Sequence, residues 1–211
     1  MAKEARLIAT NPPSGEVSAV VTVSVQDIAY YVALSGDDGA DGLSWATPKK
    51  TIQAAVDLCQ IPGGAVWVSN GIYDAGGRAA FGLSNRVVIT NAIIVRSANG
   101  PFSTYIFGDL DPDSTNLYGC GPNAVRCAYL SGGATLDGFG MANGRTDFSS
   151  GSVNGGGVLC NSSEERLLNC VVTGCVADGH GGGVYRGALT RCELNNNYAS
   201  QDGGGAYDSQ V

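Results

Sequence analysis

Charged side chains are scarce in this chain, and most of those present are acidic. Of the 211 residues 15% are charged, and 19 acidic against 12 basic residues give a net charge of −7. This balance argues against nucleic acid as a partner, because binding to a phosphate backbone needs an excess of Lys and Arg. It argues more weakly against anionic polysaccharides, since a local basic patch could outweigh the total charge. Hydrophobic residues make up 44% of the chain, but they are spread too evenly for a membrane span.

The chain also lacks recognisable signals for export and for zinc. Residues 1–6 are not followed by an apolar core with a small-residue cleavage site, so either the protein is intracellular or a leader has been removed. No Cys-x-x-Cys pair and no Cys/His cluster has the spacing of a zinc site. The seven cysteines are an odd number and too sparse for a disulfide scaffold, so at least one thiol stays unpaired in a monomer.

Glycine is abundant instead, and part of it recurs in a regular pattern. The chain has 32 glycines, and three Gly-Gly-Gly triplets begin at residues 155, 181 and 203, 26 and then 22 residues apart. A period of this length is typical of one coil of a solenoid. Each triplet opens a short β-prone segment, and these segments are residues 158–160, 184–186 and 206–208. The triplets therefore predict coils that stack directly on one another.

A second pattern repeats within the coils. Residues 168–172 and 190–194 both contain a cysteine, and the residue five positions later is Cys175 in one coil and Asn197 in the next. The segment that ends at Asn143 fits the same frame one coil earlier. We therefore expect Asn143, Cys175 and Asn197 to form a ladder whose polar groups bond to each other and to the backbone. The alternative is that the run of asparagines around Asn197 is an ordinary loop.

The repeated cysteines themselves should stack in the interior. Cys170 and Cys192 occupy the same position in successive coils. Neighbouring strands lie roughly 4.8 Å apart, a distance that permits either free thiols or a vertical disulfide.

Hydrophobic periodicity predicts one helix among many strands. Apolar residues at 52, 55, 56 and 59 form one stripe of a helix, with Thr47 as its N-cap and Pro48 at its first position. Residues 16–25 alternate as a strand does, and further strands are expected at residues 30–34, 65–68, 86–90, 92–96, 104–107 and 125–130.

The expected organisation has three parts. Residues 1–28 form an N-terminal extension with a strand, residues 29–64 form a cap with the helix, and residues 65–211 form the coils. A helix ahead of the coils would cover the apolar end and the unpaired backbone of the first one. No such cap follows the last triplet, so we expect a longer solenoid that is truncated after residue 211, or an open end that meets another subunit.

Several segments resemble one known group of proteins. Residues 31–47, 51–56, 97–101 and 136–139 resemble the opening of bacterial right-handed parallel β-helix repeat proteins of the pectate-lyase-like superfamily. The Gly-Gly-Gly-Val units are more loosely similar to repeats of chlamydial polymorphic outer-membrane proteins. The resemblance covers residues 30–211 and implies an all-β fold, a right-handed parallel β-helix, in a secreted or surface-exposed protein. It carries no catalytic residue across, because no enzymatic motif is matched.

One acidic loop has the carboxylate spacing of a calcium site. Asp109, Asp111 and Asp113 alternate so that one loop could direct three oxygen ligands at Ca²⁺. The loop departs from an EF-hand at its sixth and twelfth positions, which are Ser114 and Cys120. The alternative is a solvated acidic turn. Calcium at these residues is the one cofactor that we consider, and none is otherwise expected.

Two tyrosines suggest a ligand-binding column. Tyr185 and Tyr207 lie at the same offset from their triplets, and Leu159 has that offset in the preceding coil. If the column faces outward, sugar rings could stack on it while Arg186 and Asp208 hold their edges. If it faces inward, it is core. The segments are too short for strand parity to decide.

Catalytic groups form no tight signature. A lyase of acidic sugars needs a base and a cation, and a hydrolase needs two carboxylates at a controlled separation. The candidates near the repeats are Asp178, His180, Arg186, Asp202 and Asp208.

Three functions follow from these observations. The first is a secreted or cell-surface structural and binding module that recognises carbohydrate, such as a host or cell-surface glycan, or acts in adhesion. The second is a polysaccharide lyase or glycoside hydrolase. The third is a self-assembling solenoid element that associates head to tail through its uncapped C-terminal coil.

Overall fold

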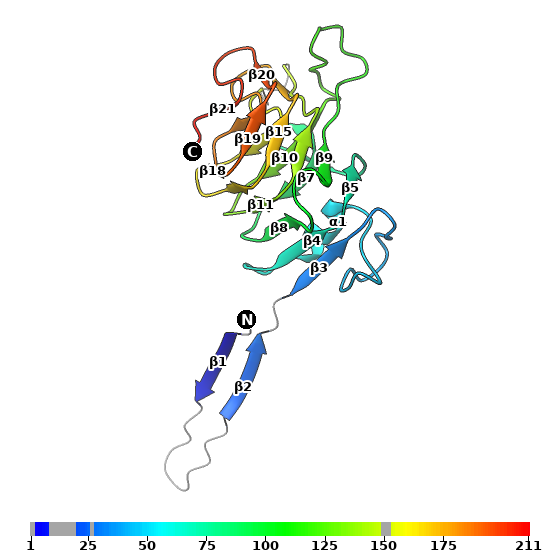
Figure 1. The fold of residues 1–211 in the computed structure, drawn as a ribbon, viewed down its shortest axis with the longest axis vertical. Helices are drawn as coiled ribbons and strands as arrows, with labels where there is room; N and C mark the ends of the chain where they lie inside the picture. Colours follow the sequence, from blue (N-terminus) through cyan, green and yellow to red (C-terminus); the bar gives the residue numbers. More distant parts are fainter. Residues whose placement is uncertain (1–2, 9–19, 26–27, 149–152) are drawn as a thin grey trace.

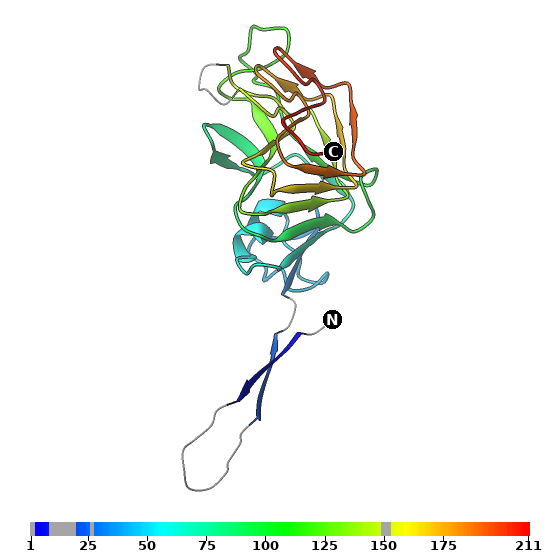
Figure 2. The same cartoon turned by 90° about the vertical axis from the view of Figure 1, so that its left-hand side faces the viewer.

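The computed structural model describes residues 3–8, 20–25, 28–148 and 153–211 and shows a right-handed parallel β-helix with one α-helix (Figure 1). Short strands pair with their equivalents in the coils before and after, so that the rungs stack as Figure 2 shows. The fold class expected from the sequence is confirmed. No helix among the described residues is long and apolar enough to cross a membrane.

Three sheets form the walls of the β-helix. Sheet 1 contains β6 (Arg78–Ala80), β7 (Leu83–Ile89), β10 (Val125–Leu130), β13 (Val158–Cys160), β17 (Val184–Tyr185) and β21 (Ala206–Tyr207). Sheet 2 contains β3 (Ala29–Val32), β4 (Ala65–Val68), β8 (Ile94–Ser97), β11 (Thr135–Asp137), β14 (Arg166–Leu168) and β18 (Ala188–Thr190). Sheet 3 contains β5 (Gly71–Tyr73), β9 (Thr104–Phe107), β12 (Gly140–Ala142), β15 (Val171–Thr173) and β19 (Glu193–Asn195).

Two smaller pairs complete the strands. β16 (Val176–Ala177) pairs in parallel with β20 (Tyr198–Ala199). In the chain, these two strands follow β15 and β19 of sheet 3. β1 (Lys3–Ile8) pairs antiparallel with β2 (Val20–Val25), which accounts for the second half of the strand expected at residues 16–25. Residues 16–19 of that expectation lie outside the described residues.

The core is a thin stack of apolar columns. Val158 pairs with Val184, and Val184 pairs with Ala206, so the segments opened by the glycine triplets are vertical neighbours as the sequence predicts. In sheets 2 and 3 the equivalent inward columns contain Leu136 and Leu167, and Met141 and Val172, and all four are fully buried. Like side chains therefore stack on like side chains along the axis.

The ladder expected at Asn143 is out of register by one residue. Gly140 pairs with Val171, and Arg145 forms a bridge with Val176, so Gly144 rather than Asn143 lies under Cys175. The sequence pattern did not distinguish the two positions, because Asn143 is polar and Gly144 is small, and either type of residue is common at a turn. Asn143 takes the left-handed turn conformation, with φ of 60°.

In the upper part of that ladder, Asn197 bonds to the backbone of the coil below. The Asn197 carboxamide oxygen accepts the Cys175 backbone N–H at 3.0 Å, and its Nδ2 donates to the Val172 carbonyl at 2.9 Å. Asn197 is therefore a structural residue that satisfies the backbone of the coil below it, not an ordinary loop residue.

The predicted helix exists but begins later than expected. α1 spans Ile52–Leu58, and its N-cap is Thr51, whose hydroxyl accepts the Ala54 N–H at 3.3 Å. Thr47 does not cap the helix because the following residues are used by the neighbouring strand: the Lys49 N–H donates to the Tyr31 carbonyl, and Lys49 forms a bridge with Val32. The buried face of α1 packs against β3, β4 and β7.

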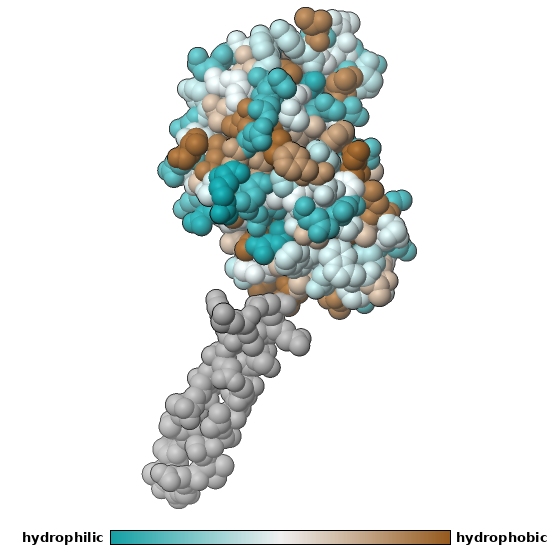
Figure 3. Space-filling view, in the orientation of Figure 1, coloured by the Kyte–Doolittle hydropathy of each residue, from teal (hydrophilic) through white to brown (hydrophobic). Residues whose placement is uncertain are grey.

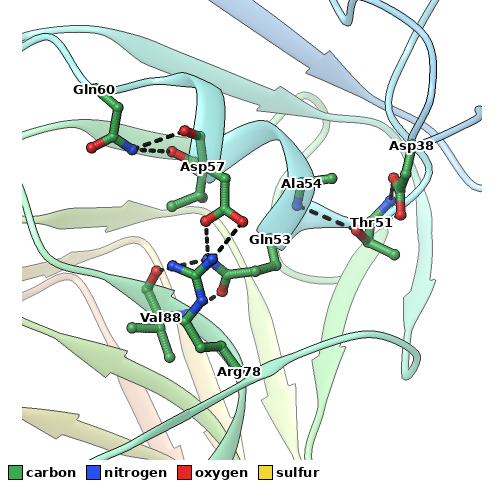
Figure 4. Close-up of polar contacts among 9 residues, drawn as sticks. Asp38, Thr51, Gln53, Ala54, Asp57, Gln60, Arg78 and Val88 are labelled. Carbon is green, nitrogen blue, oxygen red and sulfur yellow. Dashed lines mark hydrogen bonds and ion pairs between the residues drawn. The ribbon is translucent and has the colours of Figure 1, made fainter.

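Gln53, on α1, bonds to the backbone of β7 with both ends of its carboxamide. The Gln53 carboxamide accepts the Val88 backbone N–H at 2.7 Å and donates to the Val88 carbonyl at 3.2 Å, so it pairs with the edge of β7 opposite β10 (Figure 4). Its Nε2 also donates to Asp57 at 2.8 Å. Gln53 and Val88 are both buried, with 6% and 4% exposure.

Removing that carboxamide should weaken the fold. In Gln53→Leu, the Val88 N–H and carbonyl would stay buried without partners, and we expect the free energy of unfolding to fall by about 2 kcal/mol. Urea denaturation measures this change. Gln60→Leu is the matched control, because the exposed Gln60 bonds only to carbonyls of the helix, those of Val56 and Asp57. Equal stability of the two variants would show that Gln53 does not support β7.

Candidate ligand-binding face

A column of large side chains runs along the outer face of sheet 1. Tyr129, Leu159, Tyr185 and Tyr207 are successive partners in the strand register, and each follows a residue of the inward column. Because side chains alternate across a strand, these four face outward. The register thus decides between the two orientations that the sequence left open. The three tyrosines are half-buried, and Leu159 is buried.

The upper end of this column is a continuous stack. The rings of Tyr185 and Tyr207 are 5.9 Å apart with an interplanar angle of 9°. The His180 ring stacks on Tyr207 at 4.3 Å, and the Arg186 guanidinium lies 5.1 Å from the Tyr185 ring. Because the rings are already packed against one another, they would lose little conformational entropy when a ligand binds.

The lower end holds a second aromatic pair. Phe81, in the turn between β6 and β7, stacks on Tyr129 with centroids 5.9 Å apart and an interplanar angle of 16°. Phe81 is 60% exposed and has a positive φ of 53°. Sequence reasoning missed both residues. Tyr129 could have been found from its register with Leu159, whereas nothing in the sequence places Phe81 beside it.

Between the two aromatic pairs the column carries only Leu159, and a hollow opens there. This Leu159 hollow has a volume of about 230 Å³ and is lined by Phe81, Tyr129, Asn154, Leu159, Cys160, Asn161, Tyr185 and Arg186. It adjoins a polar depression of about 480 Å³, which shares Asn161 and Arg186 with it and is otherwise lined by Ser162, Ser163, Asp208, Ser209 and Gln210. Together they combine an apolar floor with a polar rim.

Arg186 is fixed at the junction of the two depressions. Its Nε lies 3.1 Å from Asp208 Oδ2, and its Nη1 donates to the Asn161 carbonyl at 3.1 Å. Arg186 and Asp208 both have a positive φ, 61° and 53°, and occupy equivalent positions at the corner after their strands. The salt bridge balances the charge of the guanidinium, so the rim offers hydrogen bonds without a large net charge.

The catalytic candidates do not form one site. His180 Nδ1 lies 3.4 Å from Asp202 Oδ2, and the His180 ring stacks on Tyr207. Asp178 instead lines another pocket, of about 290 Å³, beside the stacked rings of Tyr118 and Tyr198. Each of Asp202 and Asp208 faces its own basic partner.

The carboxylates of the acidic loop bond to groups of the same region of the chain. Asp111 accepts the backbone N–H groups of Asp113 at 2.9 Å and Asn123 at 3.1 Å, and these bonds lower the pKa of its carboxyl. Asp109 instead accepts the N–H of the following residue, Leu110. Across residues 28–148 and 153–211, no three His, Cys, Asp or Glu side chains converge to hold a metal. Asp111 and Asp113 both approach Asn123 Nδ2, at 3.4 and 3.5 Å, whereas Asp109 bonds to Leu110, and calcium at this loop stays a prediction.

The surface around these features is mixed in character. On the face shown in Figure 3, hydrophobic residues form separate small groups among hydrophilic ones.

Comparison with known proteins gives a likeness of fold only. No family model matches the chain, and no curated protein matches it significantly. Among solved structures, the chain is similar to a pectin methylesterase from carrot, with a TM-score of 0.46 and 14% identity over 77% of this chain and 44% of that one. It is also similar to a mutant pectin methylesterase in complex with a hexasaccharide, with a TM-score of 0.43 and 14% identity over 80% of this chain and 54% of that one. The chain thus spans about half the length of these enzymes.

Proposed function

We propose that this protein is a carbohydrate-binding β-helix module whose Leu159 hollow takes one sugar ring of a neutral oligosaccharide. The observation that carries the proposal is the hollow itself, an apolar floor between two rigid aromatic pairs with amide groups at its rim. A pyranose ring has an apolar C–H face and a polar edge. The former suits Leu159 and the tyrosines, and the latter suits Asn154 and Asn161.

The size and charge of the face narrow the ligand. At about 230 Å³ the hollow is smaller than the 300–1,000 Å³ that is typical of sites for whole small molecules, so it suits one ring of a longer chain. The neighbouring rings would lie in the polar depression lined by Ser162 and Gln210. Because Asp208 balances Arg186 and the chain has a net charge of −7, the face favours neutral sugars over acidic ones. The resemblance of residues 30–211 to β-helix repeat proteins of the pectate-lyase-like superfamily implies that this binding takes place outside the cell.

Filling the hollow should weaken binding at least tenfold without disturbing the fold. Leu159→Tyr continues the tyrosine column of Tyr129, Tyr185 and Tyr207 and occupies the space above Leu159. We expect at least a tenfold loss of affinity, about 1.4 kcal/mol, for the oligosaccharide that binds most strongly on a glycan array, measured by titration calorimetry. Tyr185→Ala should lose binding as well, because it removes one wall.

A control variant is measured in the same titration. Tyr198→Ala alters an aromatic pair in a different pocket and should bind as the parent chain does. An array without any hit, or full affinity in Leu159→Tyr, would contradict the proposal. Release of unsaturated oligosaccharides or reducing ends would instead indicate the second candidate, a polysaccharide lyase or hydrolase, which the His180–Asp202 pair beside Tyr207 favours.

A further inference from the structure

Two cysteines stand one above the other at the corner between sheets 2 and 3. Val171 pairs with Glu193, and the Glu193 N–H donates to the Cys170 carbonyl at 2.9 Å, so Cys170 and Cys192 are neighbours in adjacent coils. Adjacent strands lie about 4.8 Å apart, which is inside the range of about 4.4–6.8 Å between the Cα atoms of a disulfide. Both residues are free thiols in the structure.

The two thiols are in contact but differ in their access to solvent. Cys170 is 1% exposed, whereas Cys192 is half-buried at the surface. Cys170 Sγ lies 3.2 Å from the Leu168 carbonyl, and Cys192 Sγ lies 3.3 Å from the Leu167 carbonyl of the same coil. The contact with Cys170 lowers the pKa of Cys192 to about 7, and burial raises the pKa of Cys170 well above its usual value. Cys192 is therefore the thiol that reacts first.

We propose that Cys170 and Cys192 form a thiol–disulfide modification site that accepts a low-molecular-weight disulfide and closes into a cross-coil disulfide. The Cys192 thiolate attacks one sulfur of the small disulfide, the bond between its two sulfurs breaks, and one small thiolate leaves and takes up a proton. The Cys170 sulfur, after giving its proton to water, attacks the Cys192 sulfur of the mixed disulfide, and the second small thiol leaves. The two cysteines are oxidised by two electrons, and the small disulfide is reduced to two thiols.

A second cysteine pair provides an internal control. The thiols of Cys127 and Cys175 also hydrogen-bond to each other, but both residues are 0% exposed. A reagent in solution cannot reach either sulfur while the chain is folded. Contact between two thiols is thus present at both sites, and access is present only at Cys192.

The test oxidises the folded, fully reduced chain with oxidised glutathione. The reaction is stopped by alkylation in denaturant, and the peptides are mapped by fragmentation in a mass spectrometer. We expect a Cys170–Cys192 disulfide that forms roughly a hundredfold faster than any product at Cys127 or Cys175. The initial rate should rise about fivefold from pH 6 to pH 7 and level off above about pH 8, as the fraction of thiolate does.

Single variants separate the two steps. Cys170→Ser should stop at a stable glutathione adduct on Cys192, and Cys192→Ser should leave Cys170 unmodified. A glutathione adduct that persists on Cys192 of the parent chain, or oxidation of Cys127 and Cys175 at the same rate, would overturn the proposal. The experiment on the parent chain needs no variant, so it remains decisive if a substitution disturbs folding.

Discussion

Gly182→Ala should unfold the upper coils, with a loss of about 3 kcal/mol or more of the free energy of unfolding. A Cβ at this position would lie against the Tyr198 carbonyl, closer than real Cβ contacts allow, and 2.5 Å from the Gly204 carbonyl oxygen. Both obstacles are backbone groups in paired or stacked segments, so neither can turn aside as a flexible side chain can. Overpacking of this kind typically costs about 1–3 kcal/mol, and more where the backbone must move. The φ of Gly182 is not positive, so the effect is steric and not conformational.

Gly205→Ala is the matched control for this prediction. Gly205 also belongs to a triplet and has no positive φ, but a Cβ there would meet only the Leu194 side chain at 3.5 Å, an ordinary contact. We expect its stability to stay within about 0.5 kcal/mol of the parent chain. Urea denaturation followed by far-ultraviolet circular dichroism measures both variants. If Gly182→Ala were as stable as Gly205→Ala, close approach of the coils would not explain the triplets.

The difference between these glycines also shows what the sequence could and could not predict. The repeat of the triplets predicted the stacking of Val158, Val184 and Ala206, because a period of 26 and then 22 residues has few other structural explanations. It did not predict why the glycines are needed. For the middle glycines Gly156 and Gly182, that reason is the approach of β16 and β20, two segments of two residues each that carry no periodic signal. The first glycine of each triplet instead has a positive φ, between 65° and 69°.

The strand register was the main feature of the site that could not be predicted from the sequence. The sequence placed Asn143 under Cys175, although Gly144 lies there, because a frame shifted by one residue still aligned small and polar positions. Strand parity could not orient Tyr185 and Tyr207, and only the pairing with Val184 and Ala206 made them outward-facing. The hollow at Leu159 depends on Phe81, which comes from a hairpin outside the repeat.

Arg126 is the residue that sequence reasoning overlooked most completely. It lies on β10 and is fully buried. It bonds to the coil whose glycine triplet begins at Gly155: its Nε donates to the Gly155 carbonyl at 2.6 Å, and its Nη2 donates to the Asn154 carbonyl at 3.0 Å. Its Nη1 donates to the Asn85 carboxamide oxygen at 2.8 Å. Burial lowers the pKa of Arg126 to about 10. An arginine in a short strand gives no sign in the sequence that it is inside, since buried arginines are rare.

Arg126→Met should therefore destabilise the chain by about 3 kcal/mol, and two opposing effects decide the sign. Methionine avoids the desolvation of a buried charge, which favours the variant. It also leaves the carbonyls of Gly155 and Asn154 and the Asn85 carboxamide without these donors, and the loss at these three acceptors, two of them in buried bonds, outweighs that gain. Arg126→Lys should lose stability too, because one ammonium group cannot reach acceptors in three directions.

The ligand face gives this prediction a second readout. Asn154 lines the Leu159 hollow, and its carbonyl is held by Arg126, so Arg126→Met should weaken oligosaccharide binding as well as lower the urea midpoint. Arg166→Met, on an exposed position of β14, is the control and should change stability by less than about 0.5 kcal/mol. If Arg126→Met equalled the parent chain in stability, the cost of desolvating the guanidinium would be as large as the stabilisation from its hydrogen bonds to Gly155, Asn154 and Asn85. If it lost stability but bound the ligand normally, Asn154 would not belong to the site.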